Sequence, residues 1–86
     1  MPIISVFFGI IIWMYYKEHE PGHFHGEHQG QKGKFDFSGT MIVGQIQSRT
    51  ALRLIREWAV LHQAELQANW ERMKAGQPLN GIGPLE

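Results

Sequence analysis

The sequence predicts an α+β domain in which an antiparallel sheet of four to five strands is followed by one long C-terminal helix packed across one face. Short runs of β-branched and aromatic residues, separated by Gly, Pro and polar residues, fill positions 3–46. Apolar residues then recur every three or four positions from about 49 to 75. A chain of 86 residues is expected to form a single domain, 1–86, that ends in a short tail, 76–86.

Five short runs account for the predicted sheet. Residues 3–7 and 10–16 are rich in Ile, Phe, Trp and Tyr and predict two buried strands with a turn at Phe8-Gly9. The charged loop "KEHEPG" precedes "HFHGEH", in which polar and apolar residues alternate as they do in a strand. After a turn at "QGQKG", the remaining strands are expected at "KFDFS" and "MIVGQI".

A single helix is predicted from about residue 49 to residue 75. Ser48 is a suitable N-cap, and Gly76 and Pro78 end the helical pattern. His62 falls within the apolar stripe, so we expect it in the core or at the boundary between helix and sheet. The stripe is formed by Ala51, Ile55, Trp58, His62, Leu66, Asn69 and Met73.

Composition narrows the classes of function. The chain has no cysteine, which excludes disulfides and thiolate metal sites and is consistent with a cytoplasmic protein. Eight basic and eight acidic side chains cancel, so nucleic-acid binding would depend on a local patch rather than on a general basic field. Residues 3–16 carry no charge, but this run is shorter than the ~20 residues that span a bilayer as a helix, and we expect no membrane segment.

Several motifs carry a family resemblance. They are Phe7-Phe8-Gly9-Ile10, Met14-Tyr15-Tyr16, His19, Pro21, and His23-Phe24-His25. Together with the Arg-, Trp- and Leu-rich C-terminal helix, they make nearly the whole chain similar to the small bacterial domain-of-unknown-function family 4160. Gly22 is a departure, because members usually have a second proline there. The resemblance implies no activity, but the family's genes often adjoin those of another small uncharacterised family, which implies a paired, toxin–antitoxin-like module.

The segment "HEPGHFHGEH", residues 19–28, is the first candidate for a functional site because it holds four of the five histidines. Strand alternation places His23, His25 and Glu27 on one face. Two imidazoles with His19 or Glu27 as a third ligand would suit zinc or another divalent transition metal. In the absence of a metal, His23 or His25 would act as general acid or base in a small ribonuclease. A solvated sheet face or a partner interface without chemistry is the third interpretation.

Basic side chains form a second candidate site. Arg49, Arg53 and Arg56 lie on one side of the predicted helix, and together with Lys34 they would bind phosphate groups or an acidic partner. The alternative is a solvated helix face on which Arg53 pairs with Glu57.

The predicted architecture leaves one sheet face bare, although residues 10–16 are apolar on both faces. We therefore expect a protein partner or a homodimer, with RNA as a further possible partner. The preferred function is an interaction module of a paired system, with no cofactor. The alternatives are a metal-independent ribonuclease and a metal-binding domain, so whether the chain is an enzyme stays open.

Overall fold

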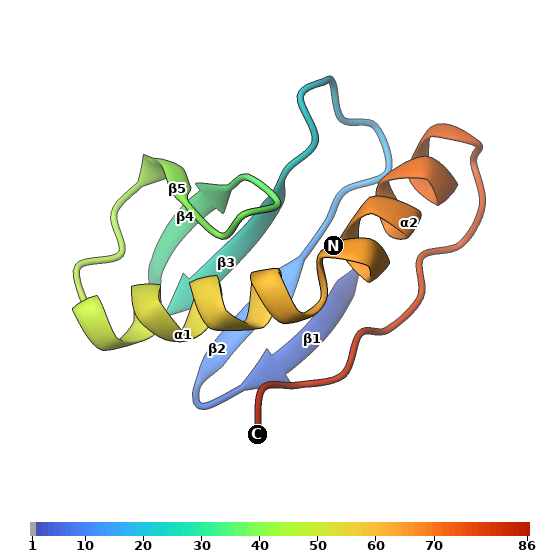
Figure 1. The fold of residues 1–86 in the computed structure, drawn as a ribbon. Coiled ribbons are helices and arrows are strands. Elements are labelled where there is room, and N and C mark those ends of the chain that lie inside the picture. The colour runs from blue at the N-terminus through green and yellow to red at the C-terminus, as the bar shows by residue number, and fades with distance from the viewer. Residues whose placement is uncertain (1) are drawn as a thin grey trace.

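A computed structural model describes residues 2–86 as a five-stranded antiparallel sheet followed by two helices (Figure 1). The strands lie in the sheet in sequence order, each antiparallel to its neighbours. This meander confirms the predicted α+β class and the antiparallel sheet. The strands are β1 (Ile3–Phe7), β2 (Ile10–Trp13), β3 (Phe24–His28), β4 (Gln31–Phe35) and β5 (Met41–Gly44).

Two tight turns set the first and third hairpin connections. Phe8 and Gly9 both have positive φ, 49° and 76°, as the predicted two-residue turn between β1 and β2 requires. Gln29 and Gly30 repeat this conformation, with φ of 51° and 81°. Because these two residues suffice to reverse the chain, the turn predicted over 29–33 is too long, and β4 already begins at Gln31.

Three predicted strands end earlier than expected, and the one predicted over 41–46 stops at Gly44. The strand predicted over 10–16 stops at Trp13, because its neighbour β1 begins at Ile3, directly opposite Trp13. The strand predicted over 34–38 stops at Phe35, because Asp36 starts a turn. Its carboxylate Oδ1 accepts hydrogen bonds from the backbone N–H groups of Ser38 and Thr40 and from the Ser38 hydroxyl. The side chain of Asp36 thus replaces the ladder partners that a longer strand would need.

The single helix predicted over 49–75 is wrong: the structure has two helices, α1 (Arg49–Leu61) and α2 (Gln63–Lys74). The break lies at His62, where φ is −111° and ψ is 24°. A straight helix over residues 49–74 would be about 39 Å long at 1.5 Å per residue. The longest dimension of the bent molecule is only 34 Å. Bending at His62 therefore lets both halves of the apolar stripe reach the core.

The start of α1 and the end of α2 both have recognisable caps. The Ser48 hydroxyl accepts a hydrogen bond from Ala51 N at 3.1 Å, which confirms the predicted N-cap. At the other end, Gly76 has φ of 72°, and the N–H groups of Gly76 and Gln77 bond back to the carbonyls of Met73 and Arg72. This is a Schellman motif, which explains why the helix stops where the sequence predicts.

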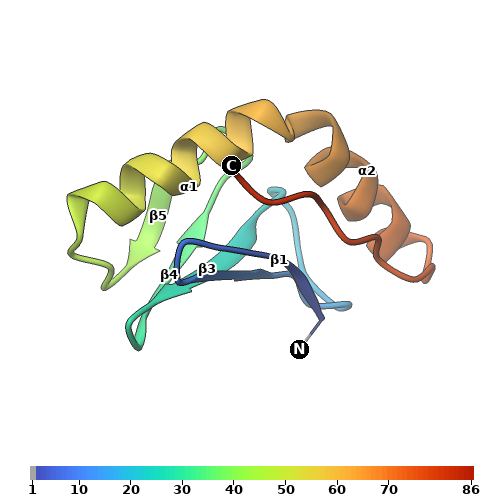
Figure 2. The same cartoon turned by 90° about the horizontal axis from the view of Figure 1, so that it is seen from below.

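Both helices lie on one face of the sheet, and no element of residues 2–86 covers the opposite face (Figure 2). The core between the two layers holds the stacked pair Phe24 and Phe35, with Trp58 packed edge-on against Phe24. The C-terminal tail runs beside β1, where Ile82 N donates to the Ile4 carbonyl at 2.7 Å. None of the helices formed by residues 2–86 has both the length and the apolar character of a membrane span.

Candidate metal centre

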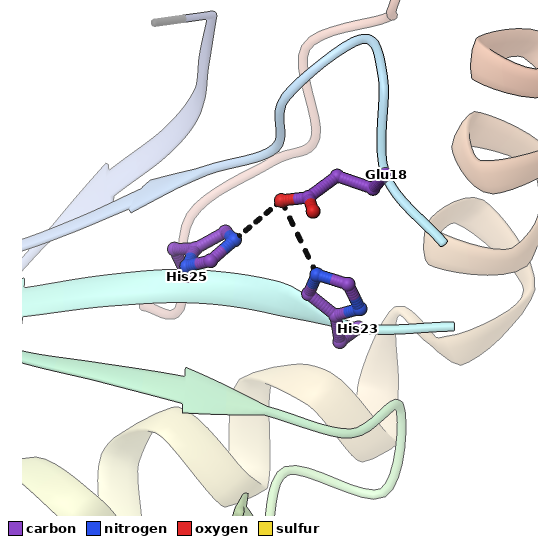
Figure 3. Close-up of side chains that lie close together, drawn as sticks. All are labelled: Glu18, His23 and His25. Carbon is purple, nitrogen blue, oxygen red and sulfur yellow. Dashed lines mark hydrogen bonds and ion pairs between the residues drawn. The ribbon is translucent and has the colours of Figure 1, made fainter. Parts of the chain in front are cut away.

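Three side chains converge near the start of β3: Glu18, His23 and His25 (Figure 3). Glu18 lies in the loop between β2 and β3, His23 precedes β3 directly, and His25 is the second residue of β3. Residues 23 and 25 point to the same side because side chains alternate along an extended chain. The loop then folds back so that the carboxylate of Glu18 faces both imidazoles.

Both imidazoles approach the same carboxylate oxygen. His25 Nε2 lies 2.8 Å from Glu18 Oε1, and His23 Nε2 lies 3.2 Å from it. The candidate ligand atoms of the three residues lie within 4.8 Å of one another. The centre is largely sheltered from solvent, since the side chains of His23, His25 and Glu18 are 3%, 20% and 22% exposed.

The hydrogen bond of His23 Nδ1 indicates which ring nitrogen carries the proton. His23 Nδ1 lies 3.0 Å from the carbonyl oxygen of Pro21. Because a carbonyl only accepts, Nδ1 carries the proton, and Nε2 of a neutral His23 has a lone pair. That lone pair faces a carboxylate oxygen, and His23 Nε2 is a buried atom without a hydrogen-bond partner. A cation between the two atoms, either a proton or a metal ion, would turn this repulsion into attraction.

Glu18 is ionised in this setting. Burial disfavours the charged carboxylate, but its contacts with His25 and His23 outweigh that effect, and the pKa of Glu18 lies below its ordinary value. The centre therefore presents an anionic oxygen together with two imidazole nitrogens at neutral pH.

Aromatic rings and one further carboxylate hold the ligands in place. The ring of His25 stacks on Trp13 with 5.7 Å between centroids, and Trp70 packs against His23 at 5.2 Å. The loop that carries Glu18 is tied to α2 through Glu20, which accepts hydrogen bonds from Trp70 Nε1 at 2.8 Å and Lys74 Nζ at 3.1 Å. The loop that carries Glu18 is thus fastened to α2 at Glu20, two residues away.

The distances from Glu18 to the two imidazoles come near those of a tetrahedral metal site. Tetrahedral zinc with bonds near 2.1 Å keeps its ligand atoms about 3.4 Å apart, close to the 3.2 Å between Glu18 and His23. The shorter contact to His25 would open by about half an ångström. The bond from His23 Nδ1 to a backbone carbonyl is the outer interaction that usually orients a metal-binding imidazole.

Only part of the predicted metal set comes together. Of His19, His23, His25 and Glu27, the structure joins His23 and His25. His19 is exposed and lines a neighbouring cleft with Lys17, Glu18 and Lys74. Glu27 lies two residues beyond His25 on β3. It faces Lys32 on β4, whose Nζ is 4.0 Å from Glu27 Oε1. Glu18 takes the third position, and no motif in the loop "KEHEPG" distinguishes it from Glu20.

The arginines lie away from the histidines. Arg49, Arg53 and Arg56 are all exposed on α1, on the helical side of the sheet, and Arg53 Nη1 pairs with Glu57 Oε1 at 3.0 Å. His25 and its cross-strand neighbour Lys34 share the opposite, uncovered face. The three arginines therefore lie on the other side of the sheet from His25, which lines one groove together with Lys34.

Comparison with known proteins gives one match. Residues 9–71 match the family described as Domain of unknown function (DUF4160). No curated protein and no solved structure matches the chain.

Proposed function

We propose a metal-binding function for this chain, which belongs to the DUF4160 family: Glu18, His23 and His25 hold a divalent transition-metal ion. The observation that carries the proposal is the buried His23 Nε2, which has no hydrogen-bond partner and lies 3.2 Å from the Glu18 Oε1 oxygen. Two imidazoles and one carboxylate are a common ligand set of zinc sites that keep a fourth position open. Zinc is therefore the ion we expect, with the fourth position available to water or to a bound ligand.

The structure gives less support to the other two candidate functions. A metal-independent ribonuclease would use His23 or His25 as general acid or base. The side chain of His23 is only 3% exposed, and His25, which is 20% exposed, has its Nε2 2.8 Å from Glu18 Oε1. The arginines that would bind phosphate in such an enzyme lie on the helical side of the sheet, whereas His25 lies on the uncovered face. An interaction module of a paired system draws support from the uncovered sheet face, and that face adjoins His25.

The test is metal analysis of protein purified without an affinity tag, equilibrated with zinc and dialysed. We expect stoichiometric zinc in the wild type. Glu18→Gln keeps the shape of the side chain but removes its charge, and it should weaken zinc binding by at least about 100-fold, the upper range for loss of an outer partner. Zinc at 100 times its Kd should stabilise the wild type by about 2.7 kcal/mol against unfolding, and at the same zinc concentration this gain should fall to about 0.4 kcal/mol or less in Glu18→Gln.

Two matched variants serve as controls. His19→Ala removes an imidazole from the same loop, and Glu27→Gln neutralises a carboxylate on the same strand. Both should bind zinc as the wild type does. A wild type that holds no zinc after equilibration, or a Glu18→Gln variant with wild-type affinity, would overturn the proposal. Loss of zinc in His19→Ala or Glu27→Gln would assign the site to different ligands and overturn it as well.

A further inference from the structure

The uncovered face of the sheet carries a row of side chains that begins beside the candidate metal centre. Cross-strand pairing joins Trp13 to His25, His25 to Lys34, and Lys34 to Val43. Directly paired residues of neighbouring strands point to the same face. His25 is thus both a member of the metal centre and the middle of a row that crosses four strands.

A groove follows this row of side chains. Its volume of about 300 Å³ is at the lower limit of typical ligand sites. Its walls combine aromatic and cationic groups. Tyr15, 41% exposed, stands edge-on to the ring of His25 with 4.9 Å between centroids. The lining side chains are Trp13, Tyr15, His25, Lys32, Lys34 and Val43.

The two lysines of the groove are available to an anionic ligand. Lys34 forms no salt bridge with any residue between 2 and 86, and the carboxylate nearest to Lys32 is that of Glu27 at 4.0 Å. Two residues apart on one strand, Lys32 and Lys34 are separated by about 6.7 Å of backbone and share a face. That spacing suits successive phosphates of an extended single strand.

The same lysines argue against a protein partner on this groove. Lysine is depleted from the centres of protein interfaces, because its charge and flexible stem are costly to bury. A symmetric dimer through this face would also bring the groove of one copy, with its lysines, against the same groove of the other. An open sheet face that pairs an exposed aromatic ring with lysines instead fits base stacking and phosphate binding.

We propose that this groove binds single-stranded nucleic acid. Tyr15 stacks on a base, and Lys32 and Lys34 bind phosphates. A metal held by Glu18, His23 and His25 would attract a further phosphate oxygen beside His25. Only this last contact rests on the proposed metal-binding function. Because two phosphates are neutralised by lysine, the logarithm of the binding constant should fall with the logarithm of salt concentration with a slope of about −1.4.

The test is fluorescence anisotropy with labelled ten-residue oligo(U) and oligo(dT), using zinc-loaded protein and protein stripped with EDTA. Binding of either oligonucleotide supports the proposal, and zinc should tighten it. Tyr15→Ala should weaken binding by about 10-fold, as expected for loss of one stacked base. Lys34→Ala should weaken it and reduce the salt slope by about 0.7.

Matched controls come from the neighbouring residues. Tyr16 and Lys17 are exposed like Tyr15 but line the cleft on the other side of Glu18. Tyr16→Ala and Lys17→Ala should bind as the wild type does. Failure of both oligonucleotides to bind zinc-loaded protein, or equal losses in the Tyr15 and Tyr16 variants, would overturn this inference. Zinc bound without oligonucleotide binding leaves the metal proposal standing. A wild type that binds oligonucleotide but takes up no zinc on equilibration overturns the metal proposal alone.

Discussion

Glu20 and Trp70 lie 50 residues apart in the chain, and a hydrogen bond of 2.8 Å joins the indole Nε1 to the carboxylate Oε1. This bond lowers the pKa of Glu20, and a second hydrogen bond from Lys74 acts in the same direction. It also fastens the loop that carries Glu18 to α2. We therefore expect the geometry of the candidate metal centre to depend on a contact that involves none of its three ligands.

Glu20→Ala should therefore weaken zinc binding although it removes no ligand. We expect about a 10-fold loss of affinity, the lower range for an outer interaction that orients ligands. A competition titration against a coloured zinc chelator measures it. Glu71→Ala is the matched control, because Glu71 also contacts Lys74, at 3.3 Å, but does not reach the loop. Equal affinities for Glu20→Ala and the wild type would contradict this account.

Asn69 should contribute to stability by holding the C-terminal tail. It is buried, its Nδ2 donates to the Asn80 carbonyl, and its Oδ1 accepts from Asn80 N, each at 2.9 Å. Asn69→Ala should lower the free energy of unfolding by about 2 kcal/mol, because it leaves both backbone groups without a partner. Urea denaturation measures the loss. Asn80→Ala keeps the backbone that makes these bonds and should cost much less, so similar losses in both variants would argue against this role.

Gly39 should tolerate no side chain, because the turn between β4 and β5 packs against α1. Its φ is 85°, and an added Cβ would lie 2.6 Å from Arg56 Cα and 3.1 Å from Ala59 Cβ. Gly39→Ala should therefore cost about 3 kcal/mol, the sum of a left-handed alanine and displaced packing. Gly30 has a similar φ of 81°, but open space surrounds it. Gly30→Ala should therefore lower the free energy of unfolding by only about 1 kcal/mol. Thermal unfolding compares the two, and equal losses would show that the helix contact is unimportant.

Asp36 should make stability depend on acidity. The hydrogen bond from the Ser38 hydroxyl lowers its pKa, and the backbone N–H groups of Thr40 and Ser38 add to this although burial opposes it. Because the pKa is lower in the folded state than the ~3.9 of a free aspartate, the contribution is present above that value and is lost as pH falls through the folded pKa.

Asp36→Asn should accordingly be less stable than the wild type at pH 7, and its stability should change less between pH 5 and pH 2. Ser38→Ala removes the largest cause of the shift and should change the curve in the same direction. Urea denaturation across this pH range measures both. Parallel curves for the wild type and Asp36→Asn would rule the assignment out.

Local patterns were sufficient for much of this fold. The turn at Phe8-Gly9, the N-cap at Ser48 and the helix end at Gly76 follow from conformational preferences of one or two residues. The alternation that placed His23 and His25 on one side follows from strand geometry. Such features depend on neighbours in the chain, so they can be predicted without knowledge of the rest.

The helix break could not be predicted from the apolar pattern, because the stripe continues through His62 from Trp58 to Leu66 without a change of period. A break at this point satisfies the packing of two helix faces on a small sheet, and that requirement is absent from local sequence. The choice of Glu18 over His19 or Glu27 as the third member of the centre is of the same kind.

The sequence by itself determined the order of strands and helical segments and most of their caps and turns. It also determined that His23 and His25 point to the same side of the chain. Tertiary structure alone decided that Glu18 joins them, because contacts of Glu20 with Trp70 and Lys74 direct the loop. It also decided that Arg49, Arg53 and Arg56 lie on the helical side of the sheet, whereas His25 lies on the uncovered face. The physical reason is that short-range preferences set backbone conformation, whereas the meeting of distant side chains depends on how the layers pack.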